Sequence, residues 1–213
     1  MSEYLLQMTG SDKRFGGVHA LDHVNFAVMP GKVMCLAGEN GCGKSTLVKI
    51  ISGAYTRDEG EVLFEGKPIQ HITPAESSAL GIQVIYQDLS IFPNLTVMEN
   101  LAINSEITAK RKIVNKKRWE QTAKEALSKI GYNIDLYARM GDLSVADKQL
   151  VAICRALLFN AKLIIMDEPT TALTKKEVDA LFKTVRQLRD SGDRKSTRLN
   201  SSHRLTSRMP SSA

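Results

Sequence analysis

The chain reads Gly38-Glu39-Asn40-Gly41-Cys42-Gly43-Lys44-Ser45 near its beginning, and this stretch decides the fold because it fits the pattern G-x-x-x-x-G-K-[ST]. Glycines in such a loop let backbone N–H groups surround anionic oxygens, and the N-terminus of the helix that follows adds partial positive charge. We expect the Lys44 ammonium to reach the β- and γ-phosphates of a nucleotide, and the Ser45 hydroxyl to hold Mg²⁺. The loop therefore predicts a nucleotide-binding site.

The residues on either side of this loop agree with that prediction. Residues 33–37 (VMCLA) are a short apolar run typical of a buried strand, and residues 46–52 (TLVKIIS) have a helix-like pattern. A strand, a glycine loop and a helix in this order form the context that a phosphate loop requires. The residues that we expect to contact the nucleotide are Gly38, Glu39, Asn40, Gly41, Cys42, Gly43, Lys44, Ser45 and Thr46.

A second stretch supplies two carboxylates. Residues 163–168 read LIIMDE, so four large apolar residues lead directly to Asp167 and Glu168. A strand of this kind delivers both carboxylates to the carboxyl edge of a sheet, where ligands bind in open α/β folds. We expect Asp167 to hold Mg²⁺, directly or through water. Glu168 is expected to orient and deprotonate the attacking water.

Strand and helix patterns alternate along the rest of the chain. Period-two alternation and short apolar runs predict strands at residues 24–28, 33–37, 61–65, 82–86 and 163–166. Apolar residues recur on one helical face at residues 119–130 and again at 178–188. This alternation indicates an α/β fold with a parallel sheet. Residues from about 95 to 160 are mostly helical in pattern, and we expect them to form an inserted subdomain.

Composition and cysteine usage limit the class of protein. Of the 213 residues, 43% are hydrophobic and 24% are charged, so the chain can bury a core. Apolar runs are shorter than the roughly 18 residues that a spanning helix needs, and the N-terminus has no secretory pattern. The three cysteines are widely spaced and fit neither a disulfide framework nor a zinc site, which indicates a reducing compartment. His19, His23 and His71 show no metal-binding spacing.

The last 21 residues differ in kind from the rest. Residues 193–213 carry a net charge of +4 of the formal +6, so the body is nearly neutral and nucleic acid is not expected as a partner. The segment is rich in Ser and Arg, and its large apolar residues stand alone. We expect it to be disordered and not native in origin, resembling translated adapter DNA; a natural flexible terminus is the alternative.

Three further motifs complete a resemblance to a known family. Tyr86-Gln87-Asp88 lies between the two phosphate motifs, residues 143–149 (LSVADKQ) precede the Asp-Glu strand, and residues 169–174 (PTTALT) follow it. With the phosphate loop, they resemble the nucleotide-binding domain of ATP-binding cassette (ABC) transporters. The resemblance implies a P-loop NTPase (RecA-like) core with an antiparallel β subdomain and an inserted α-helical subdomain. We expect this domain to occupy residues 1–192, in incomplete form.

The resemblance also implies roles for particular residues. Gln87 would act beside Glu168 in catalysis by contacting the attacking water, and it would link the site to a membrane subunit. The implied Mg²⁺ ligands are Ser45, Gln87 and Asp167. Phe15 stands where the family has an aromatic residue that stacks on adenine.

A family signature is expected just before the Asp-Glu strand. In this family, the signature of one domain clamps the γ-phosphate that the other domain holds. The matching positions here are Ser144, Val145, Ala146 and Asp147, and Val145-Ala146 replace the usual glycine pair.

Several stretches narrow the resemblance to the ATPases of bacterial monosaccharide importers (the ribose, galactose and xylose group) or the similar autoinducer importers. These stretches are residues 13–26 (KRFGGVHALDHVNF), 38–46 (GENGCGKST), 143–149 and 168–174 (EPTTALT). The resemblance implies ATP and Mg²⁺ as cofactors. It implies a second nucleotide-binding domain and transmembrane permease subunits as partners, and a periplasmic sugar-binding protein as an indirect partner. The implied location is the cytoplasmic face of the bacterial inner membrane, and the chain would be the first of two tandem cassettes.

Two other functions stay open. A soluble ABC ATPase of the DNA-repair or translation type would need a coiled-coil insertion, a long charged linker or a basic surface, and the sequence pattern shows none of them. The second alternative is a truncated fragment that binds nucleotide but hydrolyses it poorly. In the family, an apolar strand and a γ-phosphate-sensing histidine follow the last helix, whereas here Ser191-Gly192 lead into the tail.

Overall fold

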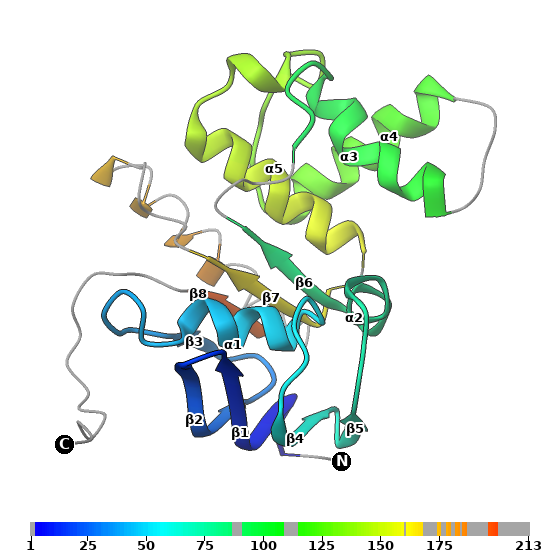
Figure 1. Cartoon of the computed structure of the whole chain (residues 1–213). Coiled ribbons are helices and arrows are strands. Elements are labelled where there is room, and N and C mark those ends of the chain that lie inside the picture. The colour runs from blue at the N-terminus through cyan, green and yellow to red at the C-terminus, as the bar shows by residue number, and fades with distance from the viewer. Residues whose placement is uncertain are drawn as a thin grey trace.

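The computed structural model describes most of the chain and shows two sheets with helices around them (Figure 1). The residues described are 3–86, 91–108, 115–159, 161–167, 174–175, 178–179, 182–183, 185–186 and 196–199. The strands are β1 Leu6–Phe15, β2 Val18–Val28, β3 Val33–Cys35, β4 Glu59–Phe64, β5 Lys67–Ile69, β6 Ile82–Ile85, β7 Leu163–Met166 and β8 Ser196–Leu199. The helices are α1 Lys44–Ile51, α2 Pro74–Leu80, α3 Val97–Thr108, α4 Lys116–Lys129, the 3₁₀ helix η1 Met140–Asp142 and α5 Val145–Leu158.

A parallel sheet in the order β3-β8-β7-β6 forms the centre of the molecule. All four residues of β7 are buried, which explains its unbroken apolar sequence. Because successive side chains in a strand point to opposite faces, Leu163 and Ile165 join one core and Ile164 and Met166 join the other. The predicted parallel α/β sheet is therefore confirmed.

The helix α1 lies between the parallel sheet and an antiparallel sheet (Figure 1). Leu47, Val48, Ile50 and Ile51 of α1 are buried in the same core as β7 residues and residues of β1, β2, β4 and β5. The antiparallel sheet has the order β2-β1-β4-β5. This arrangement fixes the start of α1, and with it the end of the phosphate loop, against both sheets.

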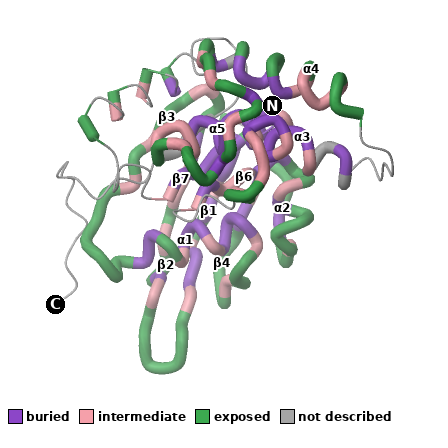
Figure 2. Tube along the Cα trace, turned by 90° about the horizontal axis from the view of Figure 1, so that it is seen from above, coloured by how far each residue is buried: buried purple, intermediate pink, exposed green. Residues whose placement is uncertain are grey.

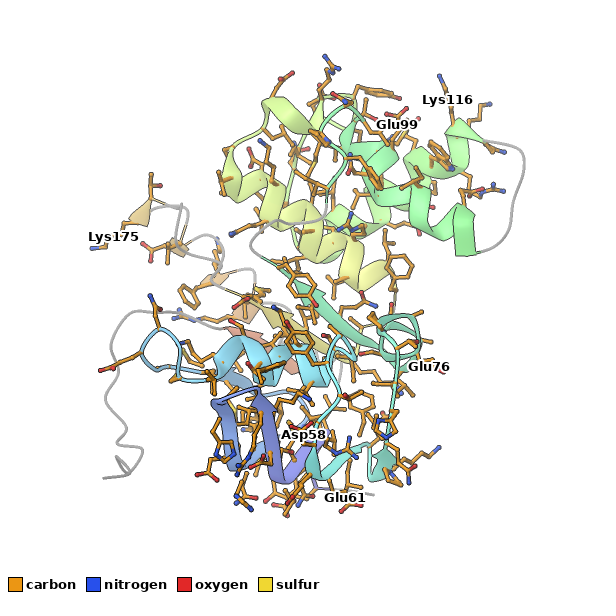
Figure 3. All side chains as sticks on the ribbon, viewed as in Figure 1. Asp58, Glu61, Glu76, Glu99, Lys116 and Lys175 are labelled. Atoms are coloured by element: carbon orange, nitrogen blue, oxygen red, sulfur yellow. The ribbon has the colours of Figure 1, made fainter. Side chains whose placement is uncertain are left out.

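Asp58 joins the far end of β1 to the start of β4, and in Figure 3 it lies above Glu61 in the antiparallel sheet. Its carboxylate accepts hydrogen bonds from Lys13 Nζ at 2.6 Å and from the Arg14 backbone N–H at 2.7 Å. These two donors hold the pKa of the Asp58 carboxyl below its usual value. The contacts therefore hold the segment that leads to Phe15 against the rest of the sheet.

Helices α3, α4 and α5 pack together on the other face of the parallel sheet, above it in Figure 1. The core there combines residues of these three helices with Ile85, Ile164 and Met166. A capping box starts α3, since the Thr96 and Glu99 side chains each accept a hydrogen bond from the other's backbone N–H. These helices fall within residues 95–160, where helices were expected; the domain boundaries stay a prediction. Among the residues described, no helix is long and apolar enough to cross a membrane.

The structure differs from the sequence predictions at several elements. Strands β1 and β5 and helix α2 were not predicted, although Thr73 and Glu76 form a capping box that signals the start of α2. Disorder was expected throughout residues 193–213, but β8 lies between β3 and β7 and pairs with both in parallel. Backbone pairing on two sides can hold a short strand whose side chains give no apolar signal. The origin of the tail stays a prediction.

Removing strand β8 tests whether this segment, which was expected to be disordered, contributes to the fold. A chain that ends at residue 195 removes β8 and leaves β3 and β7 without the strand between them. We expect its free energy of unfolding to fall by several kcal/mol, at about 1 kcal/mol for each backbone hydrogen bond lost. Urea unfolding compares it with a matched control that ends at residue 200. Equal midpoints for the two chains would show that β8 does not contribute to the fold.

Candidate nucleotide site

The phosphate loop connects β3 to α1 through two glycines with left-handed backbone. Gly41 has φ of 86° and Gly43, the N-cap of α1, has φ of 89°. In the part of the chain that the structure describes, no side chain caps α1, and its first turn contains no acidic residue. The first N–H groups of a helix lack partners within the helix, so this end offers donors and partial positive charge to an anion. The site is thus suited to phosphate.

Gly43 is enclosed by strand β2. A Cβ at this position would lie 2.3 Å from the Ala20 carbonyl oxygen and 2.8 Å from Leu21 Cδ2. At the other end of the loop, a Cβ on Gly38 would lie 2.6 Å from Cys42 Sγ. Neither position therefore accommodates a side chain without movement. The glycines allow the loop to fold closely on itself and on β2.

Lys44 lies over the loop that precedes it. Its Nζ donates hydrogen bonds to the carbonyl oxygens of Gly38 at 2.7 Å and Glu39 at 2.6 Å, and it lies 3.6 Å from Cys42 Sγ. The residue is only 9% exposed. The ammonium is therefore placed within the loop, where a bound phosphate would lie. Most of the other loop positions predicted to contact nucleotide are exposed: Gly38, Glu39, Asn40, Gly41, Cys42 and Ser45, with Thr46 half-buried.

Asp167 directly follows β7 at the carboxyl end of the parallel sheet. Its backbone N–H donates to the Ile85 carbonyl oxygen at 3.0 Å, which aligns the ends of β7 and β6. Strand β3 runs parallel to these strands, so the phosphate loop also leaves the carboxyl edge. The Ser45 hydroxyl and the Asp167 carboxylate are oxygen ligands of the kind that Mg²⁺ prefers. The predicted residues Gln87 and Glu168 lie outside the described residues.

The signature residues stand at the start of α5. Ser144 is the N-cap, and its Oγ accepts a hydrogen bond from the Asp147 N–H at 3.1 Å. The Asp147 carboxylate accepts a second hydrogen bond from the Tyr132 hydroxyl. Val145 is exposed and Ala146 is half-buried. Because α5 packs on one face of the sheet and α1 on the other, the signature and the phosphate loop belong to opposite sides of it.

Phe15 stands at the end of β1 and is 42% exposed. Its ring packs edge-on against Tyr55, with ring centroids 5.2 Å apart and an interplanar angle of 63°. Lys13 Nζ lies 5.3 Å from the Phe15 centroid. Phe15 was predicted from the sequence and Tyr55 was not, since a contact between residues so far apart in the chain leaves no local signal.

The sequence is similar to proteins of one known family. The ABC transporter family model matches residues 21–171. The chain belongs to the ABC transporter family. A relative from Rubrobacter xylanophilus, described as a ribose import ATP-binding protein (RbsA 1), is 47% identical over 188 residues, covering 88% of this chain and 38% of the relative. The chain therefore spans less than half the length of this ABC relative.

Solved structures agree with this family. The structure of MJ1267 in its ADP conformation, an ATP-binding cassette of an ABC transporter, has a TM-score of 0.81 at 34% identity, covering 96% of this chain and 83% of that one. The dimeric structure of a post-hydrolysis state of the cassette MJ0796, bound to ADP and Pi, has a TM-score of 0.76 at 25% identity, covering 92% and 87%. The predicted cassette fold is therefore confirmed, while the roles of individual residues stay predictions.

Gly43→Ala tests the contact between the phosphate loop and β2. The new methyl group would meet the Ala20 carbonyl oxygen, and the left-handed backbone adds a cost of about 1–2 kcal/mol. We expect nucleotide affinity to fall by about tenfold or more. Gly41→Ala is the matched control, because Gly41 has nearly the same φ and no described heavy atom within 4 Å of its Cβ position. Equal ATP affinities for the two variants would contradict the steric argument.

Cys42 provides a chemical test of the loop. Burial raises the pKa of the Cys154 thiol to about 12, whereas Cys35 and Cys42 are exposed. In a Cys35→Ser background we therefore expect maleimide to react at Cys42. Modification should block nucleotide binding, and ATP should slow the modification, because the thiol lies within the loop beside Lys44. Mass spectrometry measures the labelling, and equal rates with and without ATP would count against this site.

Proposed function

We propose that this chain binds ATP with Mg²⁺ and hydrolyses it to drive the uptake of a monosaccharide by an ABC importer. The observation that carries the proposal is the uncapped start of α1 with the Lys44 ammonium held above it. Membership of the ABC transporter family and 47% identity to a ribose import ATP-binding protein support the importer assignment.

Lys44 acts as the principal phosphate ligand in this proposal. Its ammonium now bonds two neutral carbonyl oxygens, and charged phosphate oxygens are stronger acceptors. The N–H groups at the start of α1 face the same oxygens. Phe15, supported by Tyr55, offers an exposed aromatic surface to the adenine ring. In this proposal, the antiparallel sheet holds the adenine base through Phe15. The loop between β3 of the parallel sheet and α1 holds the phosphates.

Hydrolysis requires residues at the carboxyl edge of the sheet. Mg²⁺ would be held by Ser45, Gln87 and Asp167, and it would neutralise charge on the phosphates. Glu168, the next residue after Asp167, orients the attacking water and accepts its proton. The Asp167 carboxylate depends on β7, since the buried strand delivers it to this edge.

The signature implies a second cassette. Ser144 and the start of α5 belong to the opposite side of the sheet from α1, and this supports a role for them on a phosphate that another cassette holds. The dimeric structure of MJ0796, a related cassette, is consistent with such a pairing. We further propose that permease subunits bind this assembly at the cytoplasmic face of the membrane, with a periplasmic sugar-binding protein acting through them.

Binding of a fluorescent ATP analogue tests the phosphate site. We expect Lys44→Ala to weaken binding about 10- to 100-fold, since charge-assisted hydrogen bonds contribute about 1.5–3 kcal/mol. Lys124→Ala is the matched control, because Lys124 lies in α4 and, among the residues that the structure describes, forms its ion pair with Glu120. The affinity of the Lys124→Ala variant for the ATP analogue should equal that of the unchanged chain. Equal binding by the two variants would overturn the assignment of Lys44.

Hydrolysis and transport need separate measurements. Glu168→Gln should abolish phosphate release and leave ATP binding intact, because only the proton acceptor is lost. Co-purification with a monosaccharide permease, and ATP-dependent sugar uptake by the complex, test the importer assignment. Binding without measurable turnover by the unchanged chain would favour a nucleotide-binding fragment. Turnover without any association with a permease would favour a soluble ABC ATPase.

A further inference from the structure

Asp12, His19, Asp22 and His23 gather at one place on the hairpin formed by β1 and β2. His19 Nε2 lies 2.5 Å from Asp12 Oδ2 and 3.9 Å from Asp22 Oδ1. His23 Nδ1 lies 2.7 Å from Asp22 Oδ1 and 3.8 Å from Asp12 Oδ2. From this cluster, we infer that the hairpin binds a divalent transition-metal ion, with Zn²⁺ as the best match.

A β-bulge builds the cluster. Ser11 pairs with Val24 and Lys13 pairs with Leu21, so Asp12 alone on β1 stands opposite Asp22 and His23 on β2. Adjacent residues of a regular strand point to opposite faces, but His23 has φ of 46°, in the left-handed region. The irregular backbone thus directs two neighbouring side chains toward the same carboxylate.

The donor set matches a small transition-metal ion. Two imidazoles and two carboxylates suit Zn²⁺, whereas Ca²⁺ and Mg²⁺ prefer oxygen ligands alone. One ligand atom each from Asp12, His19 and Asp22 lies within 4.8 Å of the others. Bonds of about 2.0–2.1 Å in a tetrahedron require ligand atoms about 3.3 Å apart. The nitrogen–oxygen distances in the cluster lie on both sides of 3.3 Å, from 2.5 to 3.9 Å. Small side-chain rotations would therefore bring the ligand atoms to the spacing that Zn²⁺ requires.

Burial and charge favour a cation at this position. The Asp12 side chain is only 5% exposed, while Asp22 and His23 are each 68% exposed and free to adjust. The Arg14 guanidinium, with Nε at 3.5 Å from Asp12 Oδ1, also contacts the buried carboxylate, and its side chain is mostly exposed. Arg14 can therefore move away when a metal ion takes its place. The hairpin turn beyond the cluster is exposed, which leaves a path from solvent (Figure 2).

Metal titration of the full chain tests the site. After treatment with EDTA, calorimetry with Zn²⁺ should show one ion bound per chain, and Zn²⁺ should raise the melting temperature. Co²⁺ should give the visible absorption of a tetrahedral site without the sulfur charge-transfer band that cysteine ligands would produce. A strong sulfur band would place the ion at a cysteine and overturn the proposal.

Three variants identify the ligands. His19→Ala and His23→Gly should each weaken Zn²⁺ binding about tenfold or more, and glycine accepts the left-handed backbone at position 23. His71→Ala is the control, because His71 is exposed and lies outside the cluster. Circular dichroism tests whether each variant is folded. His19→Ala and His23→Gly remove different ligands of the same ion, so weaker Zn²⁺ binding is expected in both. Binding that is unchanged in both of them, or several weak ions per chain, would overturn the site. ATP binding is not needed for any of these measurements.

Discussion

The burial of β7 on both faces is the constraint on which the rest of the structure depends. Leu163 and Ile165 face the core that contains α1, and Ile164 and Met166 face the core that contains α3, α4 and α5. Apolarity on both faces does not by itself fix the register of a strand. Pairing with β6 on one side and β8 on the other fixes it, and Asp167 is thereby the first residue to leave the sheet.

The same double burial separates the two regions of the chain that we propose to act on nucleotide. The helix α1 and its phosphate loop lie against one face of the sheet, and the helix α5 with Ser144 at its start lies against the other. The sheet therefore lies between Ser144 and the phosphate loop of the same chain. The packing of this one strand supports the pairing of two cassettes that we propose.

Local patterns predicted the parts of the fold and site that short stretches of chain determine. The phosphate loop and the strand that leads to Asp167 each depend on a few neighbouring residues. Contacts between distant residues left no such pattern: the Phe15–Tyr55 pair, the enclosure of Gly43 by Ala20, and β8 between two strands. The histidines showed no metal-binding spacing, because a bulge rather than a regular period brings His19 and His23 to Asp12.

The hairpin of β1 and β2 links these distant contacts. Ala20, whose carbonyl oxygen packs against Gly43, is the residue after His19, and Phe15 lies at the end of β1, three residues beyond Asp12. A metal ion on Asp12 and His19 would restrict the strand that supports the phosphate loop and the one that presents the aromatic ring. Restricting a binding surface before the ligand arrives reduces the entropy lost on binding. Occupancy of the metal site we infer should therefore favour the nucleotide-binding conformation of the loop, and by reciprocity nucleotide should favour the metal.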